Sequence, residues 1–166
     1  MKYLFLTRHA KSSWGNPGLA DIDRPLNKRG KKAAPFMGKL IMDKGEKPEL
    51  LISSPAYRAF LTAKAFGEAM GLVENDIIIN RTIYGAGAQQ LLELVQNQDD
   101  LHKSIMLFGH NPTFTSFVNF LTGSNIMNVV TCGVVRIDFE CSSWTDIDFG
   151  SGSLAYYEYP KKYDNS

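Results

Sequence analysis

The chain has 166 residues, of which 44% are hydrophobic, and a formal net charge of +1 at pH 7. This length is typical of one globular domain, so we expect a single domain over residues 1–160 and a polar tail over residues 161–166. The near-neutral charge excludes the basic excess of general nucleic-acid and membrane-surface binders. No segment has the length of a membrane span, and the apolar run after Lys2 is too short for a signal-peptide core. We therefore expect a cytoplasmic monomer without nucleic-acid or membrane partners.

The first predicted element is a buried strand that ends at an Arg–His pair. Residues 4–6 are a continuous apolar run, which is typical of a strand in a parallel sheet, and Arg8 and His9 follow directly. In open α/β sheets, ligands bind beyond the carboxyl ends of the strands. The pair is therefore a candidate binding group. A loop over residues 11–25 comes next, and its length indicates a functional segment.

Two helices are predicted on either side of a second strand over residues 49–53. The first helix begins at Asn27, a good N-cap, and Pro35 either kinks it or delays its start. The second helix takes Ser54 as its N-cap and Pro55 as its first residue.

Arg58 is placed in the first turn of this second helix. Side chains of a helix lean toward its N-terminus. The guanidinium of Arg58 is therefore expected to reach back over the sheet edge where His9 lies.

A later strand over residues 104–108 delivers a histidine at the same edge. His110 follows the strand, and Asn111 and Pro112 are predicted as the N-cap and first residue of another helix. Backbone N–H groups and the helix dipole favour an anion at such a position.

The remaining elements complete an alternating pattern of strands and helices. A short strand is expected over residues 77–79, a helix over 89–98, and further strands over 133–140 and 153–159. This alternation predicts an α/β fold, a three-layer sandwich whose mostly parallel central sheet is flanked by helices. The strand order cannot be read from the sequence.

The converging residues indicate chemistry on a phosphoryl group. Guanidinium forks such as those of Arg8 and Arg58 bind phosphoryl oxygens bidentately. These cations would also lower the pKa of His9, which must be neutral to act as a nucleophile. Attack by His9 would give a covalent phosphohistidine that water hydrolyses in a second step. Electrostatic stabilisation by the arginines and His110 would supply much of the rate.

Three blocks of the sequence resemble the histidine phosphatase (phosphoglycerate mutase-like) superfamily. They are LTRHA at residues 6–10, SSPAYRAFLTA at 53–63 and GHNP at 109–112. The short chain, the DRPL segment at 23–26 and the GHNP form look most like its SixA-type phosphohistidine phosphatase branch.

The resemblance implies a metal-independent phosphatase without a cofactor, in which His9 is the nucleophile. It places Arg8, Arg58 and His110 in the phosphate pocket as catalytic and substrate-binding residues. The SixA-type branch adds an arginine at the position of Arg24 to this pocket.

The chain departs from the family pattern in two places. Ala10 replaces the usual glycine, and the segment 81–86, where larger members carry a glutamate as general acid, has no carboxylate. Without such an acid, alkoxide leaving groups are disfavoured, whereas an imidazole leaving group needs less protonation. This favours an N–P bond as the target, although Asp21, Asp23 or His110 could supply a proton.

Three functions stay open at this point. The protein removes phosphate from phosphohistidine on proteins, or it hydrolyses a small phosphate ester or anhydride, or it is a non-catalytic phosphate-binding module. The substrate is accordingly a phosphorylated protein or a small phosphorylated molecule.

Overall fold

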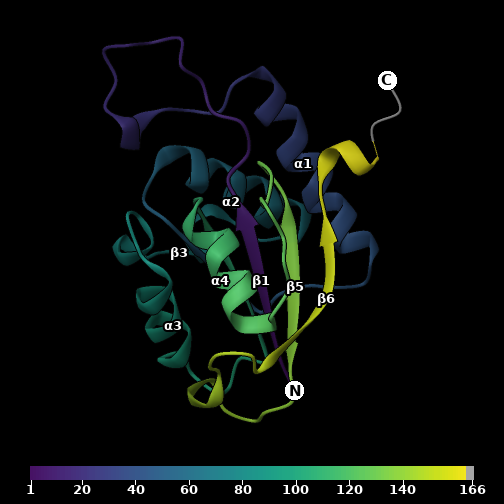
Figure 1. Cartoon of the computed structure of the whole chain (residues 1–166). Helices are drawn as coiled ribbons and strands as arrows, with labels where there is room; N and C mark the ends of the chain where they lie inside the picture. Colours follow the sequence, from purple (N-terminus) through teal and green to yellow (C-terminus); the bar gives the residue numbers. More distant parts are fainter. Residues whose placement is uncertain (164–166) are drawn as a thin grey trace.

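A six-stranded sheet forms the centre of the computed structural model, which describes residues 1–163 (Figure 1). Its strands are β1 (Lys2–Arg8), β2 (Leu50–Ser53), β3 (Ile77–Ile79), β4 (Ser104–Gly109), β5 (Val134–Phe139) and β6 (Gly152–Glu158). The spatial order is β3-β2-β4-β1-β5-β6. The strands β3, β2, β4 and β1 are parallel, whereas β5 runs antiparallel to β1 and β6 antiparallel to β5.

Helices cover both faces of this sheet. They are α1 (Lys28–Asp43), α2 (Tyr57–Ala69), α3 (Ala88–Gln96) and α4 (Thr113–Thr122). One buried cluster joins the sheet to α3 and α4, and a second joins it to α1 and α2. The predicted three-layer α/β fold with a mostly parallel sheet is confirmed. Within residues 1–163, none of the helices combines the length and the apolar character that a membrane crossing requires.

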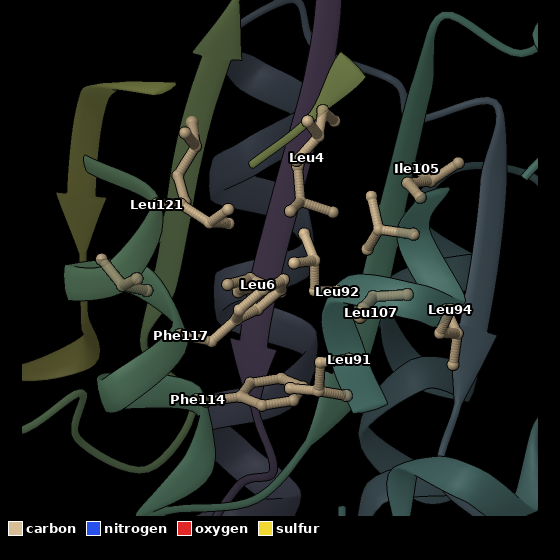
Figure 2. Close-up of a cluster of buried hydrophobic side chains, with 14 of the residues drawn as sticks. Leu4, Leu6, Leu91, Leu92, Leu94, Ile105, Leu107, Phe114, Phe117 and Leu121 are labelled. Atoms are coloured by element: carbon tan, nitrogen blue, oxygen red, sulfur yellow. The ribbon is translucent and has the colours of Figure 1, made fainter. Parts of the chain in front are cut away.

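The apolar run of β1 follows from its central position between these layers. Side chains alternate between the faces of a strand, so Leu4 and Leu6 pack toward α3 and α4, whereas Phe5 packs toward α1 and α2. Figure 2 shows Leu4 and Leu6 on the face of β1 that α4 covers, with Leu6 beside Phe117. Because both faces are covered, polar and apolar residues do not alternate over residues 4–6. The polar side chain that reaches the cavity, Arg8, comes at the carboxyl end of the strand.

The start of α1 agrees with the prediction, and the start of α2 does not. Asn27 caps α1, since its side chain accepts a hydrogen bond from the Gly30 N–H at 2.9 Å, and the helix continues through the exposed Pro35. The prediction of Ser54 and Pro55 as the first residues of α2 was wrong, because this helix begins at Tyr57. The Ser54 N–H still donates to the Phe108 carbonyl of the neighbouring strand at 3.0 Å, which keeps Ser54 extended.

The start of α4 lies one residue later than predicted. Pro112 is its N-cap, and the helix begins at Thr113. Asn111 still serves this helix end, because its side-chain oxygen accepts from the Thr115 N–H at 3.2 Å and the Thr115 hydroxyl at 2.9 Å.

The chain end near β6 is packed rather than free as far as it is described. Pro160–Lys162 form a 3-10 turn, and Lys162 Nζ donates to Glu158 Oε1 at 2.9 Å. The Tyr163 hydroxyl donates to the same buried carboxylate. Of the predicted polar tail, residues 164–166 lie outside the described part of the chain.

Candidate active site

A cavity of about 390 Å³ lies at the carboxyl ends of β1 and β4. All five residues predicted for the site line it: Arg8, His9, Arg24, Arg58 and His110. Three of them, Arg8, His9 and His110, end or follow parallel strands that are neighbours in the sheet, and Arg58 is the second residue of α2. The parallel sheet therefore brings groups that are far apart in sequence to one edge. We call this space the first cavity.

His9 presents one free ring nitrogen to the first cavity. Its Nδ1 lies 2.7 Å from the carbonyl oxygen of Ala10. A carbonyl can only accept, so Nδ1 carries the proton and Nε2 keeps its lone pair. The Ala10 backbone is itself held, because its N–H donates to the Thr62 hydroxyl at 3.0 Å. The fold thus fixes the tautomer that a nucleophilic histidine needs.

The surroundings of His9 keep its imidazole neutral. Burial, the largest cause, and the charges of Arg58, Arg8 and Arg24 together lower its pKa to about 4, although the Ala10 hydrogen bond acts to raise it. The sequence predicted the arginine effect, but it could not reveal that burial outweighs it.

His110 stands beside His9 and is also neutral. The two ring centroids are 5.4 Å apart. Burial, followed by the charge that His9 carries when it is protonated and by the charge of Arg58, lowers the pKa of His110 to about 3. Its Nε2 lies 2.8 Å from the Ser54 hydroxyl, while its buried Nδ1 has no protein partner among the described residues. If the hydroxyl donates to Nε2, Nδ1 carries a proton that is free for a ligand oxygen.

Arg58 and Arg8 also have N–H groups without protein partners. The two terminal nitrogens of Arg58 donate to Asp21, one to its carbonyl at 2.7 Å and one to its carboxylate at 3.0 Å. The Nε atoms of Arg58 and Arg8 are buried and have no partner within residues 1–163. A buried, unpaired donor is costly unless a ligand satisfies it. The side chains that carry these unpaired donors all line the first cavity, which indicates an anion site.

Arg24 lines the first cavity while its position is fixed by the loop. Its Nε donates to Asp21 Oδ1 at 3.1 Å, and another nitrogen donates to the Ser12 hydroxyl at 2.7 Å. The indole ring of Trp14, which is 77% exposed, lies 3.5 Å from the guanidinium carbon. The structure thus supports both an anchored arginine and a position at the anion site.

The loop itself is fastened to the start of α1. The Asn27 N–H donates to the Lys11 carbonyl at 2.9 Å. A Cβ on Gly30 would lie 2.2 Å from that same carbonyl oxygen, so only glycine permits this approach.

Asp21 is ionised and cannot act as a general acid in this arrangement. The Tyr84 hydroxyl donates to Asp21 Oδ2 at 2.7 Å. This hydrogen bond, with those from Arg58 and Arg24, lowers the pKa of Asp21 to about 2. Of the other two candidate proton donors, His110 is neutral and Asp23 does not line the cavity.

Several residues of the site were not singled out from the sequence as site residues. Ser54 and Asn111 lie within the blocks 53–63 and 109–112, which was an available signal. Trp14 is a large aromatic side chain in a loop of small and polar residues, another available signal. Nothing in the sequence connects Tyr84 with Asp21.

The arrangement is suited to phosphoryl transfer. A phosphoryl group in the first cavity would receive hydrogen bonds from the unpaired arginine N–H groups while His9 Nε2 attacks phosphorus. Within residues 1–163, no three His, Cys, Asp or Glu side chains gather where they could hold a metal ion.

Comparisons with known proteins place the chain among phosphatases. The family model of the histidine phosphatase superfamily (branch 1) matches residues 4–81. An uncharacterised chloroplastic protein of Arabidopsis thaliana is 30% identical over 151 residues, which cover 86% of this chain and 69% of that protein.

Solved structures with the same fold include two phosphatase-type proteins. The SixA protein of Agrobacterium tumefaciens is 29% identical, with a TM-score of 0.81 over 96% of this chain and 98% of that chain. A mycobacterial glucosyl-3-phosphoglycerate phosphatase is 14% identical, with a TM-score of 0.69 over 96% of this chain and 100% of that chain. At that identity the second match shows the fold alone. The chain belongs to the histidine phosphatase superfamily, in its SixA-type branch, and is a phosphatase.

Proposed function

We propose that the protein removes phosphoryl groups from phosphohistidine on proteins through a covalent intermediate on His9. The observation that carries this proposal is the fixed tautomer of His9, whose Nδ1 proton is held by the Ala10 carbonyl at 2.7 Å. The free Nε2 adjoins unpaired arginine donors at the first cavity. The name of the SixA relative adds support.

The reaction has two balanced steps. His9 Nε2 forms a bond to phosphorus while the bond from phosphorus to the substrate imidazole breaks, and the substrate ring leaves with both electrons of that bond. Water then attacks the phosphoryl group on His9, which releases inorganic phosphate and restores the free imidazole. The arginines and His110 stabilise the charge on the equatorial oxygens in both steps.

The choice of an N–P bond follows from the missing proton donor. Among the described residues that line the first cavity there is no carboxyl group, and Asp21 beside it is ionised. An alkoxide leaves poorly without a proton, whereas an imidazole protonated on its other nitrogen leaves as a neutral ring.

A substrate panel tests the proposal. We expect kcat/KM for a histidine-phosphorylated protein to exceed that for sugar phosphates by about 10²–10⁴-fold, the usual contribution of general acid catalysis. Para-nitrophenyl phosphate, with its good leaving group, should fall between them, and a metal chelator should leave all rates unchanged. The matched control is His9→Ala, which should be inactive on every substrate. A wild-type enzyme that prefers a sugar phosphate would instead establish the ester phosphatase function.

A further inference from the structure

A second cavity of about 460 Å³ adjoins the first and shares three lining residues with it. Arg58, His110 and Asn111 line both cavities, but His9 lines only the first. In an in-line displacement the leaving group departs on the side opposite the nucleophile. For a phosphoryl group bound at these three shared residues, the second cavity is adjoining space that His9 does not line.

The second cavity combines apolar walls with one carboxylate. Ile83, Tyr84 and Phe114 supply flat or apolar surface. Asp21 is the sole carboxylate that lines either cavity among the residues described. Its side chain is 50% exposed, so a ligand can reach it.

Asp21 has a free acceptor position in this setting. Its Oδ2 accepts from Arg58 and from the Tyr84 hydroxyl, whereas Oδ1 accepts only from Arg24 Nε. A carboxylate oxygen has two lone pairs, so Oδ1 can take one further donor. The low pKa of about 2 keeps the group negative at every physiological pH.

We propose that the second cavity is the leaving-group site, and that Asp21 there favours leaving groups with a cationic nitrogen or a ring N–H over anionic ones. For phosphohistidine, which rests on the proposed function, the donor is the ring nitrogen opposite the phosphorylated one. A carboxylate-bearing substrate such as a phosphoglycerate would instead place like charges together.

Competitive inhibition by two small esters of similar size tests this selection without requiring their turnover. Phosphoethanolamine carries an ammonium group, and 2-phosphoglycolate carries a carboxylate. Both are titrated against hydrolysis of para-nitrophenyl phosphate. We expect wild type to bind phosphoethanolamine about tenfold more tightly than 2-phosphoglycolate. The half-exposed Asp21 carboxylate attracts the ammonium and repels the carboxylate, and both effects enter the ratio of the two inhibition constants.

The variant Asp21→Asn should bring this ratio close to one. Any weaker contact of Arg58 with the phosphoryl group in the variant affects both esters alike, and that part cancels from the ratio. Asp23→Asn is the matched control, since Asp23 is exposed on the same 3-10 turn and lines neither cavity. It should keep the wild-type ratio. Tyr84→Phe retains the Asp21 charge and should also keep most of the ratio.

A ratio near one in wild type, or an unchanged ratio in Asp21→Asn, would overturn the proposal. If Asp21→Asn does not fold, the ratio of the two inhibition constants is measured in wild type and in Asp23→Asn at rising salt. A ratio set by charge falls toward one as salt screens it, whereas a ratio set by shape does not change. The outcome is independent of activity on phosphohistidine, so the proposed function and this selection can fail separately.

Discussion

Each end of β1 carries a cation, and the two cations differ in how many of their hydrogen-bond donors have a partner within the protein. Lys2 begins the strand and is 2% exposed. Its ammonium donates to the carbonyls of Asp100 at 2.7 Å and His102 at 2.9 Å, and it lies 5.3 Å from the centre of the Trp144 ring. The charge is closed in by partners.

Arg8 ends the same strand with far fewer partners. One terminal nitrogen donates to the Val129 carbonyl at 3.1 Å, and its buried Nε has no partner among the described residues. Burial lowers its pKa, but a guanidinium remains charged. A cation that stabilises a fold is saturated by its own chain, whereas one that serves a ligand keeps donors free at a cost in stability. We call the Lys2 end of β1 the closed end and the Arg8 end, where the site lies, the open end, and we expect opposite consequences of mutation at the two.

The largest effect should come from removing the free guanidinium groups. Arg8→Ala and Arg58→Ala should each lose about 3–4 kcal/mol of transition-state stabilisation in kcat/KM. Arg58→Lys should restore only part of this, because an ammonium lacks the fork. For Arg8→Ala the unfolding free energy should change by no more than about 1 kcal/mol, measured by urea titration. Near-normal kcat/KM in either alanine variant would show that its guanidinium does not serve the anion.

Acid should destabilise the open end through its two neutral histidines. The pKa of His9 is about 4 and that of His110 about 3 in the folded protein, both below the usual 6.5. Between pH 6.5 and 4 the unfolded chain therefore binds protons that the folded protein excludes, and the unfolding free energy falls as pH falls. For His9 alone the loss is roughly 3 kcal/mol.

Tungstate, an oxyanion that resembles phosphate, should reduce this loss of unfolding free energy when it is bound at the site. A neighbouring dianion favours the charged forms of His9 and His110. Asp21 also contributes to the unfolding free energy, but because its pKa is about 2 this contribution is lost only at lower pH. Urea titrations at several pH values, with and without tungstate, measure the effect, and His9→Gln should flatten the slope. Equal stability at pH 7 and pH 4.5 would contradict these pKa values.

A smaller effect is expected at the closed end. Lys2→Met keeps the apolar stem but removes the ammonium that donates to the carbonyls of Asp100 and His102, of which the His102 carbonyl still accepts from Trp144 Nε1 at 2.9 Å. The unfolding free energy should fall by about 2 kcal/mol. At temperatures where the variant is folded, its kcat/KM should match wild type. A loss of activity without a loss of stability would break the distinction between the two ends.

The convergence of the site could be predicted because its residues directly follow apolar strands. Parallel strands end at one edge, so Arg8, His9 and His110 were expected to meet there, and the resemblance added Arg24. The pattern of elements also predicted the three layers. What could not be predicted is the strand order, because it depends on pairing between segments far apart in the chain.

The contacts that tune the site arise only on folding. Tyr84 and Asp21 are separated by 63 positions, and no local pattern joins them. The acceptor for His9 is the backbone carbonyl of Ala10, a group that every residue has. Serine is a favoured N-cap residue, but the Ser54 hydroxyl instead lies 2.8 Å from His110 Nε2, because a hydrogen bond to the neighbouring strand keeps the Ser54 backbone extended.

The most direct test of the open end as a catalytic site is to trap the phosphoryl group on the enzyme. Wild type and His9→Ala are mixed with a ³²P-labelled phosphoramidate donor, quenched in alkali, digested, and the labelled peptide is sequenced. We expect acid-labile, alkali-stable label on His9 of wild type and none on the folded variant. Label of equal intensity on His9→Ala, or label of wild type at His110, would contradict it.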